Sequence, residues 1–428
     1  MGKLAISGGS KVRERPFVSH AIIEEEERKR VNEVLDSGML SGFIANAGEH
    51  FLGGKQVKEF ETLAKDYFKT KFAVAVNSAT AGLHAALGAC GVGPGDEVIV
   101  TPYTMSASAT AIIMMNAVPV FADVEEETFC LEPQKVKEKI TPKTKAIVIV
   151  HLFGHAANMD AIMKIAEEHK LSVIEDCAQS PGAAYKGKLV GTIGDIGVFS
   201  LNQHKTITSG EGGFAITNDE KLGLKMQLIR NHGEVIVDNM EVENIDGIVG
   251  FNYRMTELEA AVSIGQFRRL DSLNDHRIKL AEYLTEKLSN FEGLILPKKS
   301  NVDKHVYFVY PIRFKEDVIG VDRNTFVNAL KAEGIPFGAG YVRPIYLEPM
   351  YQRKTAYGIN GCPFTCGYYG GEANYSKGIC PVCERMHEKE LMLTGVCKSP
   401  HTKEDIDDVV KAFEKVFQNI DELKSIEK

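Results

Sequence analysis

The sequence predicts an α/β protein with two domains of unequal size, the larger built on a mostly parallel seven-stranded sheet. The chain has 428 residues, more than one hydrophobic core usually serves. Between residues 70 and 220, short β-branched runs alternate with helical patterns, which is typical of a parallel sheet with helices on both faces. We therefore expect a large domain with an N-terminal arm over 1–274, and a smaller C-terminal α/β domain over 275–428.

The large domain is expected to contain seven strands with helices between most of them. The expected strands are 72–76, 97–101, 118–124, 146–150, 172–175, 197–200 and 213–217. The expected helices are 79–89, 106–115, 132–139 and 159–168. In sheets of this kind ligands gather outside the carboxyl ends of the strands. Functional residues are therefore sought there first.

A long helix over 254–273, with Thr256 as its N-cap, is expected to lead into the second domain. In that domain we expect a strand at 306–314 and helices at 323–333 and 402–418. Residues 354–382 are rich in glycine, cysteine and tyrosine and indicate an insertion loop.

Composition narrows the class of protein. The formal net charge is −8 and no long basic run occurs, which argues against nucleic-acid and membrane-surface partners. No apolar run approaches the roughly 18 residues of a transmembrane helix, and the first residues lack the apolar core of a signal peptide. We therefore expect a cytoplasmic protein, in which thiols stay reduced.

Two residues at expected strand ends indicate the chemistry. Lys205 lies between an apolar run and the turn Gly210-Glu-Gly-Gly213, where glycine permits positive φ and close backbone approach. Partial desolvation lowers the pKa of such an amine and frees its lone pair, as a Schiff-base nucleophile requires. Asp176 follows another apolar strand. Pyridoxal 5'-phosphate (PLP) needs this pair, a lysine for its aldehyde and an acid for its pyridinium nitrogen. The sequence therefore predicts a PLP enzyme with Lys205 as the catalytic residue.

A phosphate site is predicted where residues 77–87 follow a strand and open a helix. Ser78 suits the N-cap, and first-turn amides of such a helix bind phosphate. Alone the pattern also fits an ordinary capped helix, but together with Asp176 and Lys205 it favours the cofactor. Ser200 can add a hydroxyl to the phosphate, and Gln179 can reach the phenolic oxygen of the cofactor.

Further motifs extend this pattern along the chain. They are Leu-Ser-Gly at 40–42, Ser-Ala-Thr-Ala at 78–81, Gly-Pro-Gly-Asp-Glu-Val at 93–98, His-Leu-Phe-Gly at 151–154, Glu-Asp-Cys-Ala-Gln at 175–179, Phe-Ser at 199–200, Arg-Asn-His-Gly at 230–233 and Phe-Asn-Tyr-Arg-Met-Thr-Glu at 251–257. In their order and spacing the chain resembles the DegT/DnrJ/EryC1/StrS family of PLP-dependent sugar aminotransferases, over essentially its whole length.

The resemblance implies PLP fold type I, which is aspartate aminotransferase-like, and a homodimer with active sites at the subunit interface. It implies that Lys205 forms the Schiff base with PLP and moves the proton between substrate carbon and cofactor. Asp176 would keep the pyridinium protonated, and Gln179 would contact the phenolic oxygen. The phosphate would be held by Ser78, Ala79, Thr80 and Ser200, together with Asn252 of the partner subunit.

One position departs from the family pattern. Many relatives carry an aromatic residue that stacks on the cofactor ring, and in Thr101-Pro-Tyr-Thr-Met105-Ser the corresponding residue is Met105. A thioether can pack on a π-face. Tyr103 is the alternative, and the sequence leaves the two open.

Amino transfer is favoured over dehydration. A branch of sugar dehydratases in the same family carries histidine in place of the Schiff-base lysine, and here His204 precedes Lys205. Counting from Phe199 and back from Gly210 both place Lys205 at the lysine position. We expect glutamate or glutamine as the donor and a keto sugar, nucleotide-linked in the first place, as the acceptor. A cyclitol ketone of the scyllo-inosose type is the alternative, hinted at by Asn202-Gln203.

Five cysteines lie late in the chain: Cys362, Cys366, Cys380, Cys383 and Cys397. Two close pairs separated by thirteen residues resemble the spacing of structural zinc sites. Buried free cysteines are also common. We predict no metal and keep zinc as the alternative.

Overall fold

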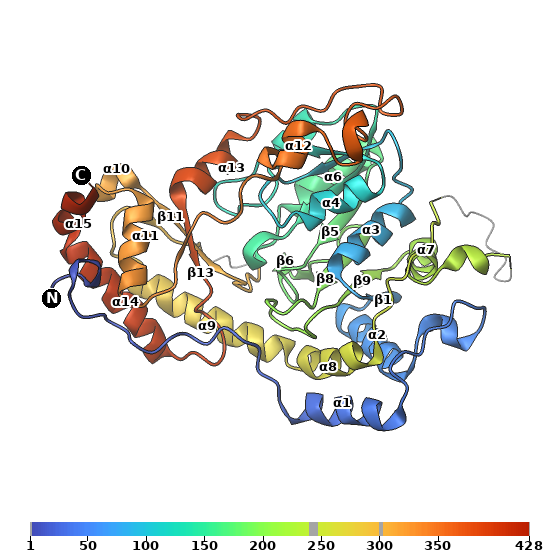
Figure 1. The fold of residues 1–428 in the computed structure, drawn as a ribbon, viewed down its shortest axis with the longest axis horizontal. Coiled ribbons are helices and arrows are strands. Elements are labelled where there is room, and N and C mark those ends of the chain that lie inside the picture. Colours follow the sequence, from blue (N-terminus) through green and yellow to red (C-terminus); the bar gives the residue numbers. More distant parts are fainter. Residues whose placement is uncertain (1, 239–246, 299–302, 428) are drawn as a thin grey trace.

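The computed structural model describes residues 2–238, 247–298 and 303–427, which form a large and a small sheet with helices around them (Figure 1). The large sheet has seven strands in the order β1-β9-β8-β5-β4-β2-β3. Its strands are β1 Phe72–Val76, β2 Glu97–Val100, β3 Val118–Phe121, β4 Thr144–Val150, β5 Ser172–Asp176, β8 Ile196–Ser200 and β9 Gly213–Thr217. Strand β9 is antiparallel to β1 and β8, and the pairs from β8 to β3 are parallel. The predicted mostly parallel seven-stranded sheet is confirmed.

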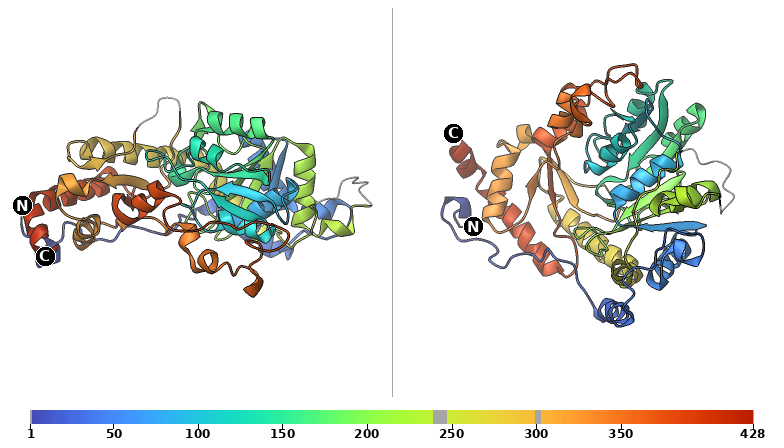
Figure 2. Two further views of the ribbon diagram at one scale, coloured as in Figure 1. Left: turned by 90° about the horizontal axis from the view of Figure 1, so that it is seen from above. Right: turned by 45° about the vertical axis from the view of Figure 1, so that its right-hand side comes forward.

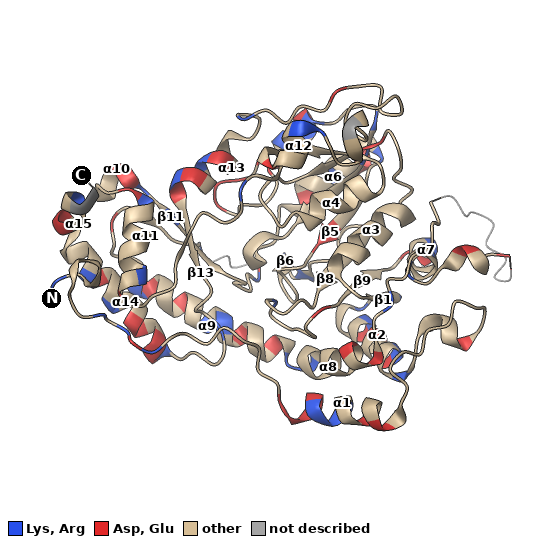
Figure 3. Ribbon diagram, in the orientation of Figure 1, with Lys and Arg blue, Asp and Glu red and all other residues tan. Residues whose placement is uncertain are grey.

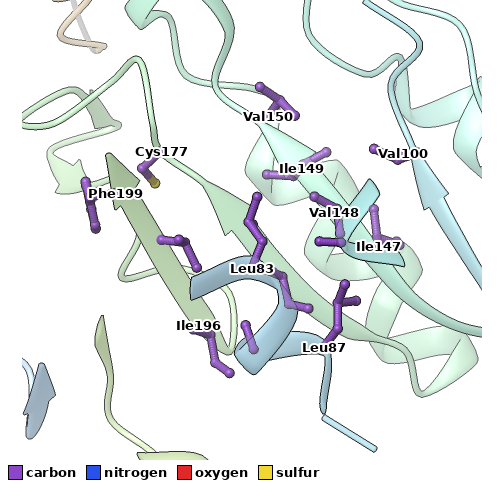
Figure 4. Packing of buried hydrophobic residues seen from close by; sticks show 14 of the residues in the cluster. Leu83, Leu87, Val100, Ile147, Val148, Ile149, Val150, Cys177, Ile196 and Phe199 are labelled. Atoms are coloured by element: carbon purple, nitrogen blue, oxygen red, sulfur yellow. The ribbon is translucent and has the colours of Figure 1, made fainter. Parts of the chain in front are cut away.

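Helix α3 (Ala79–Ala89) lies against the centre of this sheet and packs on β8 and β9. It contains no charged residue (Figure 3) and most of its side chains are small, so it approaches the strands closely. A Cβ at Gly82 would lie 2.8 Å from a methyl carbon of Val198. Leu83 and Leu87 point toward strands that carry Ile147 and Ile196 (Figure 4). This packing fixes the first turn of α3 beside the ends of β8 and β9.

The other helices of the large domain are α1 Glu25–Ser37, α2 Lys55–Phe68, α4 Ala107–Met114, α5 Pro133–Glu138, α6 Met159–His169, α7 Glu220–Arg230 and α8 Glu257–Arg268. Of these, α4, α5 and α6 lie within a few residues of the predicted positions, whereas α1, α2 and α7 were not among the expected helices. Among the described residues, no helix is long and apolar enough to cross a membrane.

The small domain has a four-stranded antiparallel sheet in the order β10-β11-β13-β12. Its elements are α9 Leu270–Leu288, β10 Leu294–Ile295, β11 Tyr310–Phe314, α10 Glu316–Ile319, α11 Arg323–Ala332, β12 Gly338–Ala339, β13 Leu391–Thr394, α14 Lys403–Gln418 and α15 Ile420–Glu427. The short helices α12 Pro349–Arg353 and α13 Pro381–Arg385 lie between these elements in the chain, but their buried side chains belong to the core cluster of the large domain. Both chain ends lie at this end of the molecule (Figure 2). Leu4 of the N-terminal arm belongs to the small domain's core cluster.

Two expected elements differ most from the structure, and the strand expected over 118–124 ends earlier, at Phe121. The helix expected over 254–273 is two helices, α8 and α9, that meet at Arg269, whose φ of −96° and ψ of 1° leave the helical range. Thr256 is the N-cap, as expected, and forms a capping box with Glu259. The strand expected over 306–314 begins only at Tyr310, because Tyr307 has a φ of 47°, which extended backbone does not allow.

The loop over 354–382 covers the edge of the large sheet next to β2 and β3. Tyrosine hydroxyls attach it: Tyr369 donates to Glu97 over 2.7 Å, and Tyr375 donates to the Pro119 carbonyl over 3.0 Å. Strand β3 is the last strand of the sheet. The loop therefore shields an edge that would otherwise present unpaired backbone groups.

Candidate active site

Asp176 is the last residue of β5 and its carboxylate is buried, with 4% of the residue exposed. The Ser108 hydroxyl donates to Oδ2 over 2.7 Å, and the Ala178 N–H donates to Oδ1 over 3.1 Å. Within the described residues, neither of these partners of Asp176 carries a positive charge. A buried carboxylate is costly without a cationic partner, so this environment suits a positively charged ring N–H.

Lys205 lies in the loop between β8 and β9, and its side chain is partly buried. Its amine lies 5.0 Å from the ring centroid of Phe308. Burial lowers the pKa of Lys205 below its usual value, while the nearby charge of Asp176 acts in the opposite direction. The structure therefore brings the two predicted residues within electrostatic reach, with the amine biased toward its neutral form.

The predicted phosphate residues converge at the start of α3. Ser78 is the N-cap, and its hydroxyl accepts from the Ala81 N–H over 3.1 Å. Ala79 and Thr80 begin the helix, where backbone N–H groups have no intrahelical partner. Ser200 is paired with Gly213 across β8 and β9.

Gly213 explains how closely these segments meet. A Cβ added there would lie 2.7 Å from the Ala79 nitrogen, so only glycine lets β9 pass this close to the helix start. Ser200 and the α3 terminus thus share one small region. The sequence predicted these residues as a set, and the fold brings them together.

Gln179 is buried and both ends of its amide are used. Its Oε1 accepts from the Phe153 N–H over 2.9 Å, and its Nε2 donates to the Tyr341 hydroxyl over 2.9 Å. An amide nitrogen has two hydrogens, so one donor remains beyond the bond to Tyr341.

Met105 and Tyr103, the two alternatives for the stacking residue, have opposite surroundings. Tyr103 is fully buried, and its hydroxyl accepts from the Tyr341 N–H over 3.0 Å. Met105 is 58% exposed. A cofactor ring needs an accessible side chain to stack on, and of the two only Met105 offers one.

Asn252 lies beside the phosphate region of its own chain. The Asn77 amide donates to the Asn252 carbonyl over 3.3 Å, and Asn252 Oδ1 accepts from Arg254 over 2.8 Å. Its side chain is exposed. Its predicted contact with phosphate stays a prediction.

The site residues fit PLP by the chemistry of their groups. The helix start offers N–H donors to a phosphate, Asp176 offers an unneutralised carboxylate to a pyridinium, and Lys205 offers an amine of lowered pKa to an aldehyde. These three functions lie at the ends of β1, β5 and β8, on one sheet.

Sequence reasoning missed three neighbours of this site: Ser108, Phe308 and Tyr341. Ser108 lies in α4, 68 positions from Asp176, and Tyr341 lies 162 positions from Gln179. Each is a common residue type without a local motif, so no signal in a single sequence marks it. Only the fold brings these residues to the site.

His151, Glu175 and Cys177 form a buried group, and Glu175 points to the face of β5 opposite to Asp176. Among the described residues, this is the one group of three side chains that could together bind a metal ion. The Glu175 carboxylate already accepts from the N–H groups of Gly191, Ile193 and Gly194, and lies 2.9 Å from His151 Nε2. With its oxygens used in this way, Glu175 holds the loop after β7 (Lys188–Leu189).

The late cysteines differ in burial. Cys380, Cys383 and Cys397 are buried, whereas Cys362 and Cys366 are only partly so. The thiols of Cys362 and Cys366 are hydrogen-bonded to each other, which lowers the pKa of Cys366. In the described part of the chain, none of the five belongs to a group of three or more possible metal ligands.

Comparison with known proteins adds independent evidence. The profile of the DegT/DnrJ/EryC1/StrS aminotransferase family matches residues 21–374. An L-glutamine:2-deoxy-scyllo-inosose aminotransferase from Micromonospora echinospora is 36% identical over 99% of this chain and 100% of its own. A GDP-perosamine synthase from Caulobacter vibrioides is 37% identical over 77% of this chain and 85% of its own. The crystal structure of an aminotransferase from Psychrobacter cryohalolentis superposes with a TM-score of 0.82 at 32% identity, and the match covers 95% of this chain and 100% of that one. The expected aminotransferase fold is confirmed.

Proposed function

Because the chain belongs to the DegT/DnrJ/EryC1/StrS aminotransferase family and is a PLP-dependent aminotransferase, we propose that it moves the amino group of glutamine or glutamate to the ketone of a cyclic polyhydroxy compound. One observation carries the assignment of the reacting residues. The amine of Lys205 is desolvated near the buried carboxylate of Asp176, whose two hydrogen-bond donors among the described residues carry no positive charge.

Each residue has a defined task in this proposal. PLP, when bound, supplies an electron sink for the carbon that loses its proton. Asp176, oriented by Ser108, keeps a proton on the ring nitrogen. Lys205 takes the proton from the substrate carbon and returns it, which requires a pKa near the working pH.

The remaining site residues hold the cofactor in place. The start of α3, with Ser78, Ala79 and Thr80, and the Ser200 hydroxyl bind the phosphate. Gln179 has one amide hydrogen left beyond its bond to Tyr341 and would donate it to the phenolic oxygen. Met105 would pack on the ring, since Tyr103 is fully buried.

The acceptor class that sequence identity over the full chain favours is a free cyclitol ketone. The Micromonospora enzyme named for 2-deoxy-scyllo-inosose matches along the full chain, including the loop over 354–382. The Caulobacter enzyme, named for GDP-perosamine, matches a shorter part at similar identity. A nucleotide-linked keto sugar is therefore the second candidate, and the two differ in whether a diphosphate must be bound.

We also propose a cytoplasmic homodimer with active sites at the subunit interface. Large apolar side chains of the large domain are exposed at Met39, Leu40, Ile44, Met105, Val235 and Val249. Such side chains are covered when subunits associate. Asn252, exposed beside the phosphate region, would then reach the cofactor of the partner subunit.

The proposal is tested by incubating the PLP-loaded enzyme with L-glutamine and either scyllo-inosose or a nucleotide-linked 4-keto sugar. We expect an aminated ring product and the 2-oxo acid in equal amounts, detected by mass spectrometry. The two ketones distinguish the two acceptor classes. Release of ammonia without amination would instead indicate a lyase and overturn the proposal.

A further inference from the structure

A cavity of about 220 Å³ lies between the Lys205 loop, the junction of α8 and α9, the N-terminal arm and the loop before α14. Of the predicted cofactor residues, only Lys205 lines it; Ser78, Asp176, Gln179 and Ser200 do not. It is far larger than one buried water requires. The cavity is therefore a separate space that shares the reacting lysine with the cofactor site.

The charge of this cavity is one-sided. In the part of the chain that the structure describes, basic side chains line it and no aspartate or glutamate does. The basic residues are His20, His204, Lys205, Arg269, Arg277 and Lys398. The whole protein carries a net charge of −8, so this is a local reversal. A concave site with one sign of charge attracts the opposite sign.

Two of these cations have no carboxylate partner among the described residues. Arg277 is 6% exposed, and its Nη1 donates only to backbone carbonyls, of Phe308 over 3.1 Å and of Tyr307 over 3.4 Å. Lys398 donates to the Ser19 carbonyl over 3.3 Å. Arg269, in contrast, is paired with Glu24 and Glu27.

The directions in which the pKa values of Arg277 and Lys398 are shifted agree with this lack of a carboxylate partner. Burial lowers the pKa of Arg277 to about 10. Burial, and then the positive charge of Arg277, lower the pKa of Lys398. Buried charges are normally paired, so an anionic ligand would complete this arrangement.

The hydroxyl of Thr206, next to Lys205, also favours an anionic ligand in this cavity. Thr206 lines the cavity, is 8% exposed, and its hydroxyl has no hydrogen-bond partner within the described residues. Buried polar groups are nearly always satisfied. An anion held in this cavity would offer the missing acceptor.

The cavity is also connected to the reacting amine. Phe308 contacts both groups: its ring lies 5.0 Å from the Lys205 amine, and its carbonyl accepts from Arg277. One residue thus separates the buried guanidinium from the nucleophile. In an amino acid, the carboxylate is attached to the carbon that carries the amino group, so its binding site must adjoin the lysine.

We propose that this cavity binds the α-carboxylate of the amino donor, with Arg277 as its principal partner and Lys398 and Thr206 beside it. The inference rests on the proposed amino transfer. It assigns Arg277 to the donor half of the reaction only. The ketone acceptor has no carboxylate and does not need the guanidinium.

The test separates the two half-reactions in the PLP-loaded enzyme. Arg277→Gln keeps an amide N–H for the carbonyls of Tyr307 and Phe308 but removes the charge. We expect the concentration of L-glutamine that half-saturates conversion of the cofactor to its amine form to rise on the order of 10²-fold. The return reaction with the ketone should stay within about twofold, and Arg277→Lys should recover part of the loss. Arg353→Gln, at an exposed arginine, is the matched control.

A donor analogue and a binding measurement sharpen this test. The analogue of glutamine with CH₂OH in place of the carboxylate should react poorly with the native enzyme, and Arg277→Gln should lose most of that discrimination. Calorimetry should detect glutarate binding to the native enzyme and the Arg353→Gln variant, and weakened binding to Arg277→Gln.

Three outcomes overturn the inference. They are unchanged donor saturation in Arg277→Gln, an equal loss in both half-reactions, which would indicate a structural role, or a loss confined to a nucleotide-linked ketone, which would indicate a phosphate site. Failure of the proposed function has a different signature, because the native enzyme itself would then not convert its cofactor with any amino acid.

Discussion

The two faces of β5 at its carboxyl end carry two buried carboxylates with different surroundings. Glu175 and Asp176 are neighbours, and successive side chains of a strand point to opposite faces. Glu175 accepts hydrogen bonds from three backbone N–H groups and lies against His151. Asp176 has one hydroxyl and one N–H. The fully satisfied carboxylate holds the fold, and the incompletely satisfied one is available for chemistry.

Buried cations also differ between two regions, the small domain with its N-terminal arm and the surroundings of Lys205. In the small domain, buried Lys415 pairs with Glu333 over 2.8 Å, and Arg13 of the arm pairs with Asp405 over 2.8 Å. Around Lys205 the cations Arg277 and Lys398 have no carboxylate partner among the described residues. Charge is balanced where the chain only needs to hold together and unbalanced where a ligand is expected.

Lys205→Ala should have the largest effect on turnover of all the variants considered. The variant loses the amine that we propose as both the Schiff-base group and the proton carrier, so turnover should fall by about 10⁴-fold. The visible absorbance of the lysine-bound cofactor should disappear as well. Product formation and the absorbance spectrum are measured on the same preparation. Retention of full activity would exclude Lys205 as the catalytic residue.

Asp176→Asn keeps the size of the side chain but removes its charge. Since the carboxylate is proposed to stabilise the protonated ring nitrogen, turnover should fall on the order of 10³-fold. The urea unfolding midpoint should change little, because neither hydrogen-bond donor to Asp176 among the described residues is charged. A large loss of stability with little loss of turnover would reverse the roles assigned to the two faces.

Glu175→Gln is the matched variant on the other face. It leaves backbone N–H groups of 191–194 with a weaker acceptor in a buried site, so the free energy of unfolding should fall by about 3 kcal/mol. Turnover per correctly folded, PLP-loaded molecule should fall far less than in Asp176→Asn. Urea unfolding and active-site titration measure the two quantities separately, and an unchanged unfolding midpoint would contradict the structural role.

The smallest expected effect concerns the pKa of Lys205. Burial lowers this pKa, and Asp176 partly offsets the shift, so in cofactor-free enzyme the neutral amine should dominate from a pH below the usual lysine value of about 10.4. The rate of PLP attachment should therefore reach half its maximum below that pH. In Asp176→Asn the midpoint should move lower still, because an anion that favours the ammonium form is removed. A midpoint at or above the usual value would contradict this environment.

The sequence predicted the parts of the site that follow local rules. Strand β1 and helix α3 have the predicted bounds, and Lys205 and Asp176 lie near each other, because glycine turns, caps and apolar runs are written locally. The break at Arg269 was not predicted, since no proline or glycine marks it and the arginine is held by Glu24 and Glu27 of a distant segment. Phe308, Arg277 and Thr206 were likewise missed because their roles arise only from neighbours far along the chain.

The antiparallel direction of β9 has a consequence for how the lysine works. The connection from β8 to β9 returns to the same sheet. The Leu201 N–H donates to the Gly212 carbonyl over 3.0 Å, and the Gln203 N–H donates to the Gly210 carbonyl over 2.7 Å. These two bonds join the chain before Lys205 to the chain after it. The main chain at the lysine is thereby tethered at two ends. Motion during a catalytic cycle is left to four methylene groups, whose rotations take picoseconds to nanoseconds when unhindered. The proton transfer that we propose for Lys205 therefore requires only a side-chain rotation on a fixed main chain, and no slower movement of the domains.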